Sequence, residues 1–317
     1  MSKEIIKDIP KELFQRWKIL FNEDFEAFIE AIITPPKPCI RLNTLKAKKE
    51  EILELLKERD VKLTEVPWYD KGYFINVEEE ETIGNWWEHF AGLIYIQSAD
   101  SMIPPIVLSP MEEEYVLDMC ASPGSKTTQI ADMMKNKGII IANDINTRRI
   151  KALTSNLERM GVINTIVTMT DGVRFGKLMP NYFDKVLVDA PCSAEGTIRK
   201  SYKAIYNWTP NTPRKMSNIQ KALIISAYKA LKPNGVLVYS TCTFSPEENE
   251  EVVSYLVEKH EAYLEEVNLR GLRTRSGIVE WMGKKYNQEV SKAIRIYPHE
   301  NEVGGFFIAK IRKPNNK

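Results

Sequence analysis

The spacing of apolar and polar positions divides the chain into two parts. In residues 10–33 apolar side chains recur every three or four positions, which predicts a pair of amphipathic helices. Residues 34–38 contain three prolines and end this pattern, because proline cannot continue a helix. A strand candidate at 39–43 precedes a helix at 50–59. We expect residues 1–108 to form a small N-terminal α+β domain whose strand-helix-strand order suits a ferredoxin-like or RNA-recognition-type sheet.

From residue 109 onward, short apolar runs alternate with amphipathic segments of helical length. This alternation predicts a second α/β domain over residues 109–317, with a mostly parallel, Rossmann-like sheet and helices on both faces. Before it, residues 95–104 are expected to begin a helix, and Ser245–Glu248 to open another. The expected strands are 115–120, 138–143, 163–169, 183–190, 236–239, 291–297 and 306–311, and the main helices are 125–134, 146–160 and 217–231.

Cysteine usage and hydropathy limit the class of protein. The four cysteines form no Cys-x-x-Cys pair, and the 317 residues contain only three histidines, so neither a disulfide framework nor a zinc site is expected. No run approaches the roughly 18 apolar residues of a membrane-spanning helix. We therefore expect a cytoplasmic protein without metal or membrane attachment.

Charge is unevenly distributed, although the net charge is only +1. Residues 1–110 carry 14 basic and 20 acidic side chains, which leaves 30 basic and 23 acidic side chains in the remainder. Residues 196–246 contain eight basic residues and no acidic one. This segment predicts a polyanionic partner for the second domain.

The first strand of the second domain ends in a turn of small residues that leads into a helix, at residues 118–128. Such a turn lets backbone N–H groups approach a ligand. It is not a Walker A loop, because Ser125 stands where that loop needs glycine. An acid also ends each of the next two strands, at Asp144 and Asp171. A lone aspartate there is usually a cap or turn residue, but this series favours an adenosine pocket.

Three cysteines, Cys120, Cys192 and Cys242, follow predicted strands that share one sheet edge. Free cysteines are usually small buried hydrophobes, and Cys120 fits that interpretation equally well. Pro191 before Cys192, and Ser245-Pro246 beyond Cys242, indicate thiols placed in turns at a cleft. Two thiols, an acid and an adenosine pocket suit methylation of cytosine carbon 5. A thiolate that adds to carbon 6 activates carbon 5, and a base must then remove the carbon 5 proton.

These motifs resemble the Nol/Nop/Sun family of S-adenosylmethionine-dependent RNA cytosine-5 methyltransferases, and the compact chain is most like the archaeal transfer-RNA members. The paired signatures Asp-Ala-Pro-Cys at 189–192 and Ser-Thr-Cys-Thr at 240–243 are specific in combination. Further similarity lies at residues 40–46, 95–99, 118–127 and 304–308.

The resemblance implies that Cys242 is the nucleophile and that Cys192 assists release of the methylated base. DNA cytosine-5 enzymes place the nucleophile in their Pro-Cys motif, so spacing alone assigns neither role. Similarity places Asp189 at the cytosine beside the methyl donor, and Lys126 at the target base. The family often has glycine at the position of Ser125, where serine would be strained if the backbone φ is positive. The residues implied around S-adenosylmethionine are Cys120, Ala121, Ser122, Pro123, Gly124, Ser125, Lys126, Asp144, Arg149, Asp171 and Asp189.

The acid-free segment interleaves cations with aromatic residues between the two cysteines. Cations for phosphates and rings for unstacked bases are what a single-stranded RNA site needs, whereas the plainer interpretation is a solvated basic loop. We expect RNA contact from Arg199, Lys200, Lys203, Tyr206 and Trp208.

The sequence thus predicts a monomeric RNA 5-methylcytosine methyltransferase with transfer RNA as substrate and with an N-terminal domain, residues 1–108, that faces the RNA. Ribosomal RNA is the alternative within this class, and a non-catalytic RNA-binding or ribosome-assembly protein on the same fold is the alternative outside it. The intact set Cys242, Cys192, Asp189 and Lys126 argues against a non-catalytic protein. DNA methylation is disfavoured, because the glutamate-bearing motif of those enzymes is missing.

Overall fold

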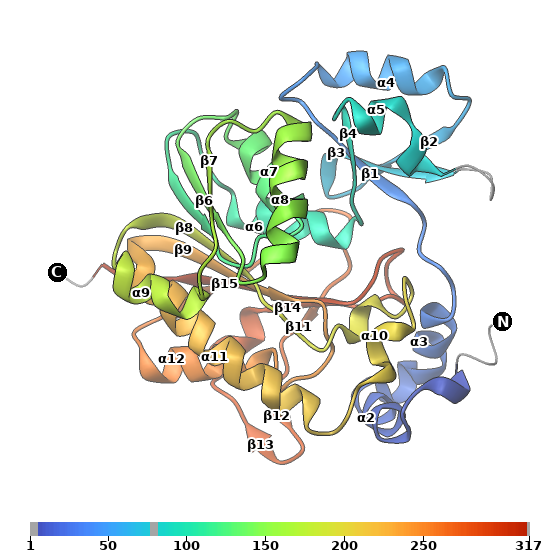
Figure 1. Cartoon of the computed structure of the whole chain (residues 1–317). Coiled ribbons are helices and arrows are strands. Elements are labelled where there is room, and N and C mark those ends of the chain that lie inside the picture. Colours follow the sequence, from blue (N-terminus) through green and yellow to red (C-terminus); the bar gives the residue numbers. More distant parts are fainter. Residues whose placement is uncertain (1–5, 77–81, 316–317) are drawn as a thin grey trace.

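The computed structural model describes residues 6–76 and 82–315, which form two sheets and a separate pair of N-terminal helices (Figure 1). The helices α2 (Lys11–Phe21) and α3 (Phe25–Ile32) confirm the predicted amphipathic pair. Their aromatic side chains do not pack on the strands that follow them in the sequence. They contact Phe244 and Tyr297, which belong to the second half of the chain.

The first sheet has four antiparallel strands in the order β2-β3-β1-β4. One helix lies between β1 and β2 and another between β3 and β4, which is the ferredoxin-like succession expected from the sequence. Residues 70–72 lie inside β3 despite their Asp-Lys-Gly sequence, and the turn that joins β2 to β3 falls at Pro67-Trp68. The elements are β1 (Cys39–Leu42), α4 (Lys49–Lys57), β2 (Lys62–Val66), β3 (Tyr69–Asn76), α5 (Trp87–Phe90) and β4 (Ile94–Ile96).

The second sheet has nine strands in the order β11-β14-β15-β9-β8-β5-β6-β7, with β10 beside β15. The strands β9-β8-β5-β6-β7 are parallel and β15 is antiparallel to β9, which confirms the predicted Rossmann-like fold. The strands are β5 (Tyr115–Asp118), β6 (Ile139–Asn143), β7 (Thr165–Thr168), β8 (Phe183–Asp189), β9 (Leu231–Thr241), β10 (Tyr263–Glu265), β11 (Arg275–Ser276), β14 (Ile294–Ile296) and β15 (Phe306–Arg312). The helices are α6 (Ile103–Leu108), α7 (Ser125–Met133), α8 (Thr147–Met160), α9 (Phe175–Leu178), α10 (Lys203–Tyr206), α11 (Thr212–Ala230) and α12 (Glu250–Lys259). A small hairpin, β12 (Glu280–Trp281) and β13 (Lys284–Lys285), stands apart from both sheets.

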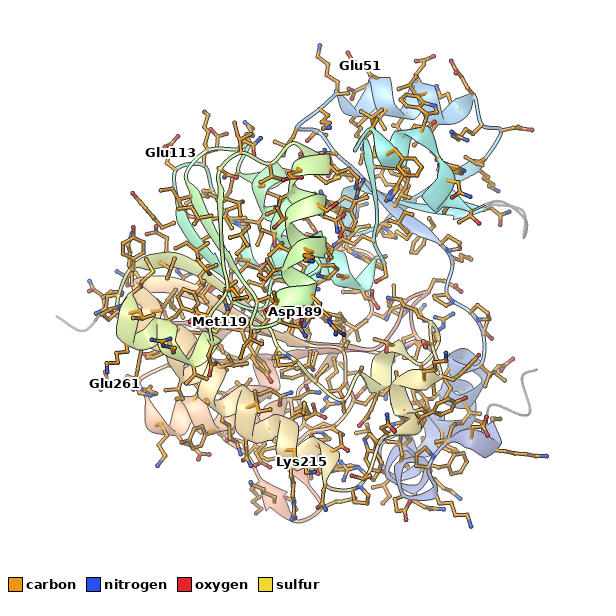
Figure 2. All side chains as sticks on the ribbon, in the orientation of Figure 1. Glu51, Glu113, Met119, Asp189, Lys215 and Glu261 are labelled. Atoms are coloured by element: carbon orange, nitrogen blue, oxygen red, sulfur yellow. The ribbon has the colours of Figure 1, made fainter. Side chains whose placement is uncertain are left out.

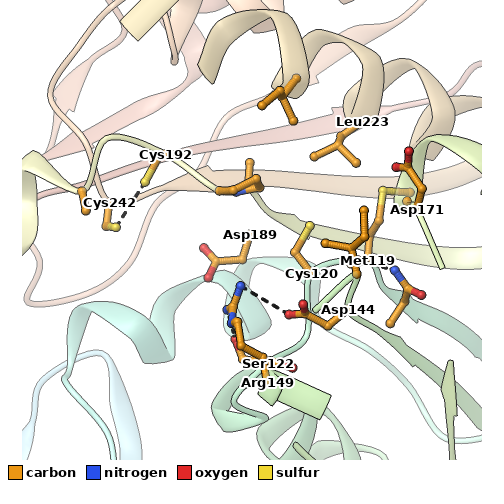
Figure 3. Close-up of a pocket in the computed structure, with 17 residues that line it drawn as sticks. Met119, Cys120, Ser122, Asp144, Arg149, Asp171, Asp189, Cys192, Leu223 and Cys242 are labelled. Carbon is orange, nitrogen blue, oxygen red and sulfur yellow. Dashed lines mark hydrogen bonds and ion pairs between the residues drawn. The ribbon is translucent and has the colours of Figure 1, made fainter. Parts of the chain in front are cut away.

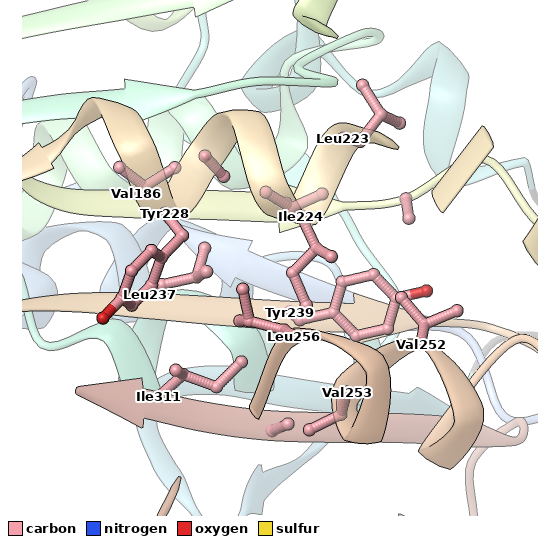
Figure 4. Close-up of a cluster of buried hydrophobic side chains, with 14 of the residues drawn as sticks. Val186, Leu223, Ile224, Tyr228, Leu237, Tyr239, Val252, Val253, Leu256 and Ile311 are labelled. Atoms are coloured by element: carbon pink, nitrogen blue, oxygen red, sulfur yellow. The ribbon is translucent and has the colours of Figure 1, made fainter. Parts of the chain in front are cut away.

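Helices cover both faces of this sheet, so its central strands are apolar at nearly every position. Val186 and Val188 of β8 pack with side chains of α11 and α12, such as Ile224 and Leu256 (Figure 4). Leu187, between them, faces the opposite side, where α6 and α7 supply the apolar contacts. Among the helices that the structure describes, none is long and apolar enough to cross a membrane.

The two sheets are joined through α6 and α7. One face of the small sheet carries Ile40 and packs on α4. The other face contributes Cys39 and Val66 to the cluster that contains α6 and part of α7. Arg41 crosses the same interface, since its Nη2 donates to Thr128 Oγ1 at 2.6 Å. The small sheet therefore packs against α4 on one face and against α6 and α7 on the other.

Two helix starts predicted from the sequence are wrong. Residues 95–104 do not begin a helix at Tyr95, which pairs with Arg41 in the small sheet, and α6 starts only at Ile103. The helix expected at Ser245–Glu248 starts at Glu250. Asn249 before it has non-helical backbone angles, and its side-chain amide donates to Thr243 O at 3.0 Å.

Candidate functional site

A pocket of about 320 Å³ lies at the carboxyl ends of β5, β6, β8 and β9. The chain runs outward from β5 to β6 and β7 and then returns to place β8 on the other side of β5, and ligands of open α/β sheets bind at such a reversal. Asp189 and Met119, which line this pocket, are labelled near the centre of the view in Figure 2. Figure 3 shows the two thiols at one end of the pocket and Asp171 at the other.

The two thiols expected at this edge are brought into contact. Cys192 follows β8, Cys242 follows β9, and their Sγ atoms are 3.3 Å apart. The hydrogen bond with Cys242 and burial raise the pKa of the Cys192 thiol well above its ordinary value. Cys192 is therefore a protonated thiol at neutral pH, able to donate to the sulfur of Cys242. Cys120 lies farther along the pocket, and burial raises its pKa as well.

Asp189 and Lys126 form an ion pair between the thiols and the rest of the pocket. Lys126 Nζ is 2.7 Å from Asp189 Oδ2 and 3.0 Å from Ser101 Oγ, while Ser240 Oγ donates to Asp189 Oδ1 at 2.8 Å. Burial lowers the pKa of Lys126, but attraction to Asp189 outweighs burial and raises it overall. The pair therefore presents the Asp189 carboxylate to the pocket, with the buried Lys126 cation holding it in place.

Acidic side chains at the other end fit the ribose of an adenosine ligand. Asp144 is 3% exposed, and its Oδ2 accepts no hydrogen bond from the described residues. Its ion pair with Arg149 is 3.4 Å long, and Arg149 also donates to Ser122 O at 2.6 Å. Asp171 caps the turn after β7 by accepting from Val173 N at 3.1 Å.

The small-residue turn contributes fewer side chains to the pocket than expected. Cys120 and Ser122 line it, whereas Ala121, Pro123, Gly124 and Ser125 do not, and Lys126 reaches it only through Asp189. The positive φ of 104° falls on Gly124, where a Cβ would meet Leu153 Cδ1 at 3.0 Å. Ser125 is the first residue of α7 and is not among the residues with positive φ, so serine is unstrained there.

Apolar walls of the pocket were missed by the sequence analysis. Met119, Ile145, Ile219 and Leu223 line it, and Ile145 and Ile219 are 67% and 45% exposed. Ile219 and Leu223 are four residues apart and share one face of α11, but the same spacing also describes an ordinary buried stripe. A pocket wall differs from a buried stripe in that some of its side chains are exposed, and only the structure shows that exposure.

Two of the five residues expected to contact RNA are buried, and this corrects the prediction. Arg199 is 6% exposed because its guanidinium donates to the carbonyl oxygens of Thr34 and Val303 at 2.8 and 2.7 Å. Trp208 is 5% exposed, and its Nε1 donates to Glu195 Oε1 at 3.0 Å. The three that stay on the surface are Lys200, Lys203 and Tyr206.

Within residues 6–76 and 82–315, no group of three or more histidine, cysteine or carboxylate side chains could hold a metal ion.

Known proteins match both parts of the chain. Residues 105–312 match the family described as 16S rRNA methyltransferase RsmB/F, and residues 9–99 match the N-terminal domain of 16S rRNA methyltransferase RsmF. A tRNA (cytosine(49)-C(5))-methyltransferase of Pyrococcus abyssi is 48% identical, over 98% of this chain and 99% of its own length. Ribosomal RNA small subunit methyltransferase F of Vibrio atlanticus is 44% identical over 92% of this chain, which spans only 60% of that protein.

Solved structures agree with these matches. A methyltransferase homolog protein from Pyrococcus horikoshii superposes with a TM-score of 0.86 at 35% identity, over 98% of both chains. The structure described as NSun6 from Pyrococcus horikoshii with SFG has a TM-score of 0.83 at 28% identity, over 97% of this chain and 99% of its own. This chain therefore belongs to the RsmB/F (Nol1/Nop2/Sun) family of S-adenosylmethionine-dependent RNA cytosine-5 methyltransferases.

Proposed function

We propose that the enzyme methylates carbon 5 of a transfer-RNA cytosine by transient attachment of the base to Cys242. The observation that supports this most is the contact between Cys242 and Cys192, 3.3 Å apart at the rim of a pocket that also holds Asp189. Cytosine carbon 5 is a poor nucleophile until a thiolate adds to carbon 6, so a thiol beside the pocket is what the reaction requires.

The residues of the pocket fit S-adenosylmethionine, which supplies an electrophilic methyl group when it is bound. Asp144 would hold the ribose hydroxyl groups, since it is a buried acceptor with an unused oxygen at the end of β6. Met119 and Leu223 would enclose the adenine, with Asp171 at its edge. Asp189 then lies between this end and the thiols, and it would orient the cytosine through its ring nitrogens.

Contact between the two thiols suggests how Cys192 acts after methyl transfer. The hydrogen bond and negative charge of Cys242 both raise the pKa of Cys192. Once the Cys242 sulfur is bonded to carbon 6, both influences weaken and the pKa of Cys192 falls. Cys192 then loses its own proton to water and, as a thiolate, accepts the carbon 5 proton as a general base. The electron pair left behind restores the double bond between carbons 5 and 6 and expels the Cys242 thiolate from carbon 6.

Transfer RNA is preferred over ribosomal RNA because of how the two relatives match. The transfer-RNA enzyme of P. abyssi is 48% identical over 98% of this chain, whereas the ribosomal RNA enzyme of V. atlanticus is 44% identical over 92% of it. RNA would approach over the exposed residues Lys200, Lys203 and Tyr206, which offer charge for phosphates and a ring for stacking.

The test is to incubate the enzyme and methyl-labelled S-adenosylmethionine with total transfer RNA and, separately, with small-subunit ribosomal RNA. We expect label in transfer RNA, at one or a few cytosines that bisulfite sequencing maps. Label in ribosomal RNA alone would assign the alternative substrate, and label in neither would contradict the proposal.

A further inference from the structure

Glu195 is a buried carboxylate beside the thiols that the proposed mechanism does not use. It is 1% exposed and begins a single 3-10 turn after β8. No basic side chain forms an ion pair with it among the described residues, so hydrogen bonds must balance the cost of burying it. Its oxygens accept from three donors: Ser245 Oγ at 2.6 Å, Trp208 Nε1 at 3.0 Å and Trp17 Nε1 at 3.2 Å.

Glu195 and its donor Ser245 belong to the two turns that carry the cysteines. Ser193 follows Cys192 directly, and Ser245 lies three residues after Cys242. The turns are also joined to each other, because Ser193 Oγ and Thr243 Oγ1 are 2.7 Å apart. Glu195 therefore ties the turn after β8 to the turn after β9, and the distance between the two sulfur atoms depends on this link.

A second buried carboxylate holds Ser193 of the Cys192 turn. Glu248 Oε2 accepts from Ser193 N at 2.9 Å and from Gln220 Nε2 at 3.0 Å, while Glu248 Oε1 accepts from Ser193 Oγ at 2.5 Å. Gln220 lies on α11, and its Nε2 also donates to Pro191 O at 2.8 Å, immediately before Cys192. The Cys192 turn is thus fixed to α11 as well as to the Cys242 turn.

The remaining donors come from outside the sheet. Trp17 lies on α2 and is 1% exposed, and its ring packs at 6.3 Å from that of Phe244, two residues after Cys242. Phe28 of α3 packs on the same ring at 5.3 Å. Arg16, next to Trp17, pairs with Glu247 at 2.7 Å. The N-terminal helices therefore contact the Cys242 turn in two ways. Their aromatic rings pack on Phe244, and Trp17 bonds to Glu195, which also accepts from Ser245.

We infer that Glu195 is a positioning residue through which helix α2 holds the Cys192 and Cys242 turns at reactive distance. The inference rests on the proposed function, because it concerns the placement of the thiol that attacks carbon 6. It also assigns α2 and α3 to the support of the active site, whereas the sequence had placed them in an RNA-facing domain. Reacting groups displaced by about 1 Å lose on the order of a hundredfold in rate, so such support affects chemistry directly.

The test measures covalent attachment to transfer RNA transcribed with 5-fluorocytidine. After Cys242 adds to carbon 6 and the methyl group reaches carbon 5, the fluorine cannot leave as a cation, so the protein–RNA adduct accumulates. The adduct rate is divided by the S-adenosylmethionine binding stoichiometry from calorimetry, which excludes unfolded protein. Glu195→Gln should lower this normalised rate about tenfold or more, with unchanged affinity for S-adenosylmethionine. Trp17→Phe, which removes one donor and keeps the ring, should lower it about threefold.

The matched control is Glu88→Gln, which alters a carboxylate that is also 1% exposed but lies in the small sheet's domain and pairs with Arg59. It should reduce thermal stability and leave the normalised rate unchanged. A role of Glu195 confined to folding would give the same pattern for Glu195→Gln and would overturn the inference. Should Glu195→Gln not fold, a normal rate for both Trp17→Phe and Ser245→Ala would overturn it too. Absence of adduct with the unsubstituted enzyme would instead contradict the proposed function.

Discussion

Cys192 and Cys242 are fifty positions apart in the sequence, yet their sulfur atoms are in contact. Both line the pocket with Asp189, but the hydrogen bond with Cys242 and burial hold the pKa of Cys192 well above its ordinary value, so Cys192 keeps its proton. Their different surroundings predict different consequences when each thiol is removed.

Cys242→Ala should abolish methyl transfer and leave S-adenosylmethionine binding intact, since the nucleophile is lost and the adenosine end of the pocket is unchanged.

Cys192→Ala should accumulate a covalent protein–RNA adduct on denaturing gels, because the base that permits release is lost. Cys39→Ala, at a buried cysteine outside the pocket, is the control for both. Turnover by Cys242→Ala, or a clean gel with normal activity for Cys192→Ala, would reverse the roles.

At the level of single residues, the sequence predicted the reactive side chains of the pocket. It did not predict which buried side chains support them. Cysteines and aspartates at strand ends were found because neighbouring parallel strands end at one edge. Arg199 and Trp208 were misplaced, since a basic, aromatic composition does not reveal what each side chain faces. Glu195 was not predicted, because its role depends on three donors, Trp17, Trp208 and Ser245, that lie 13 to 178 positions away and leave no local pattern.

Secondary-structure elements were predictable where local pattern determines them. The central strands β5 to β9 were found because each contains a short apolar run, which helices on both faces of the sheet require. The start of α12 was not found, because bonds from Asn249 to Thr241 and Thr243 delay it to Glu250. The segment between the cysteines is likewise ordered, with α10 and buried anchors at Arg199 and Trp208, so we propose RNA contact only for the exposed positions between those anchors.

Charge reversal at Lys200 and Lys203 should weaken transfer-RNA binding. It should also reduce the slope of log affinity against log salt by about 1 to 2, because up to two phosphate contacts are lost. Filter binding at a series of salt concentrations measures both effects. The control reverses two exposed lysines outside the segment, Lys259 and Lys285, and should change the slope less. An unchanged slope for the Lys200 and Lys203 variant would leave the segment without a role in RNA binding.

At the scale of the whole molecule, buried carboxylates make stability depend on pH. Burial raises the pKa of Glu248 to about 7 and that of Asp118 to about 7, from ordinary values of 4.5 and 3.8. The folded chain therefore keeps protons that the unfolded chain releases near pH 4 to 4.5. The contribution of these groups to stability is largest at low pH and is lost as pH rises toward 7.

Glu248→Gln removes one of the two carboxyl groups that bind a proton in the folded chain and release it in the unfolded chain. The free energy of unfolding of the parent, relative to this variant, should fall by about 1.4 kcal/mol per pH unit between pH 5 and 7. Urea unfolding at pH 5, 6 and 7 measures this difference. Glu54→Gln, at an exposed position of α4, is the control. A difference that is constant with pH would show that Glu248 is ionised throughout this range.

The shared face between the small sheet and helices α6 and α7 limits how this architecture can be recombined. RNA-recognition-type sheets bind bases on an open face, but here that surface is a seam, crossed by Arg41 to Thr128 and by Lys71 to Asp132 at 2.7 Å. A chimaera that grafts another N-terminal module onto residue 105 would expose an apolar surface and leave Asp132 without its cation. Exchange between relatives therefore succeeds only when both sides of the seam are transplanted together.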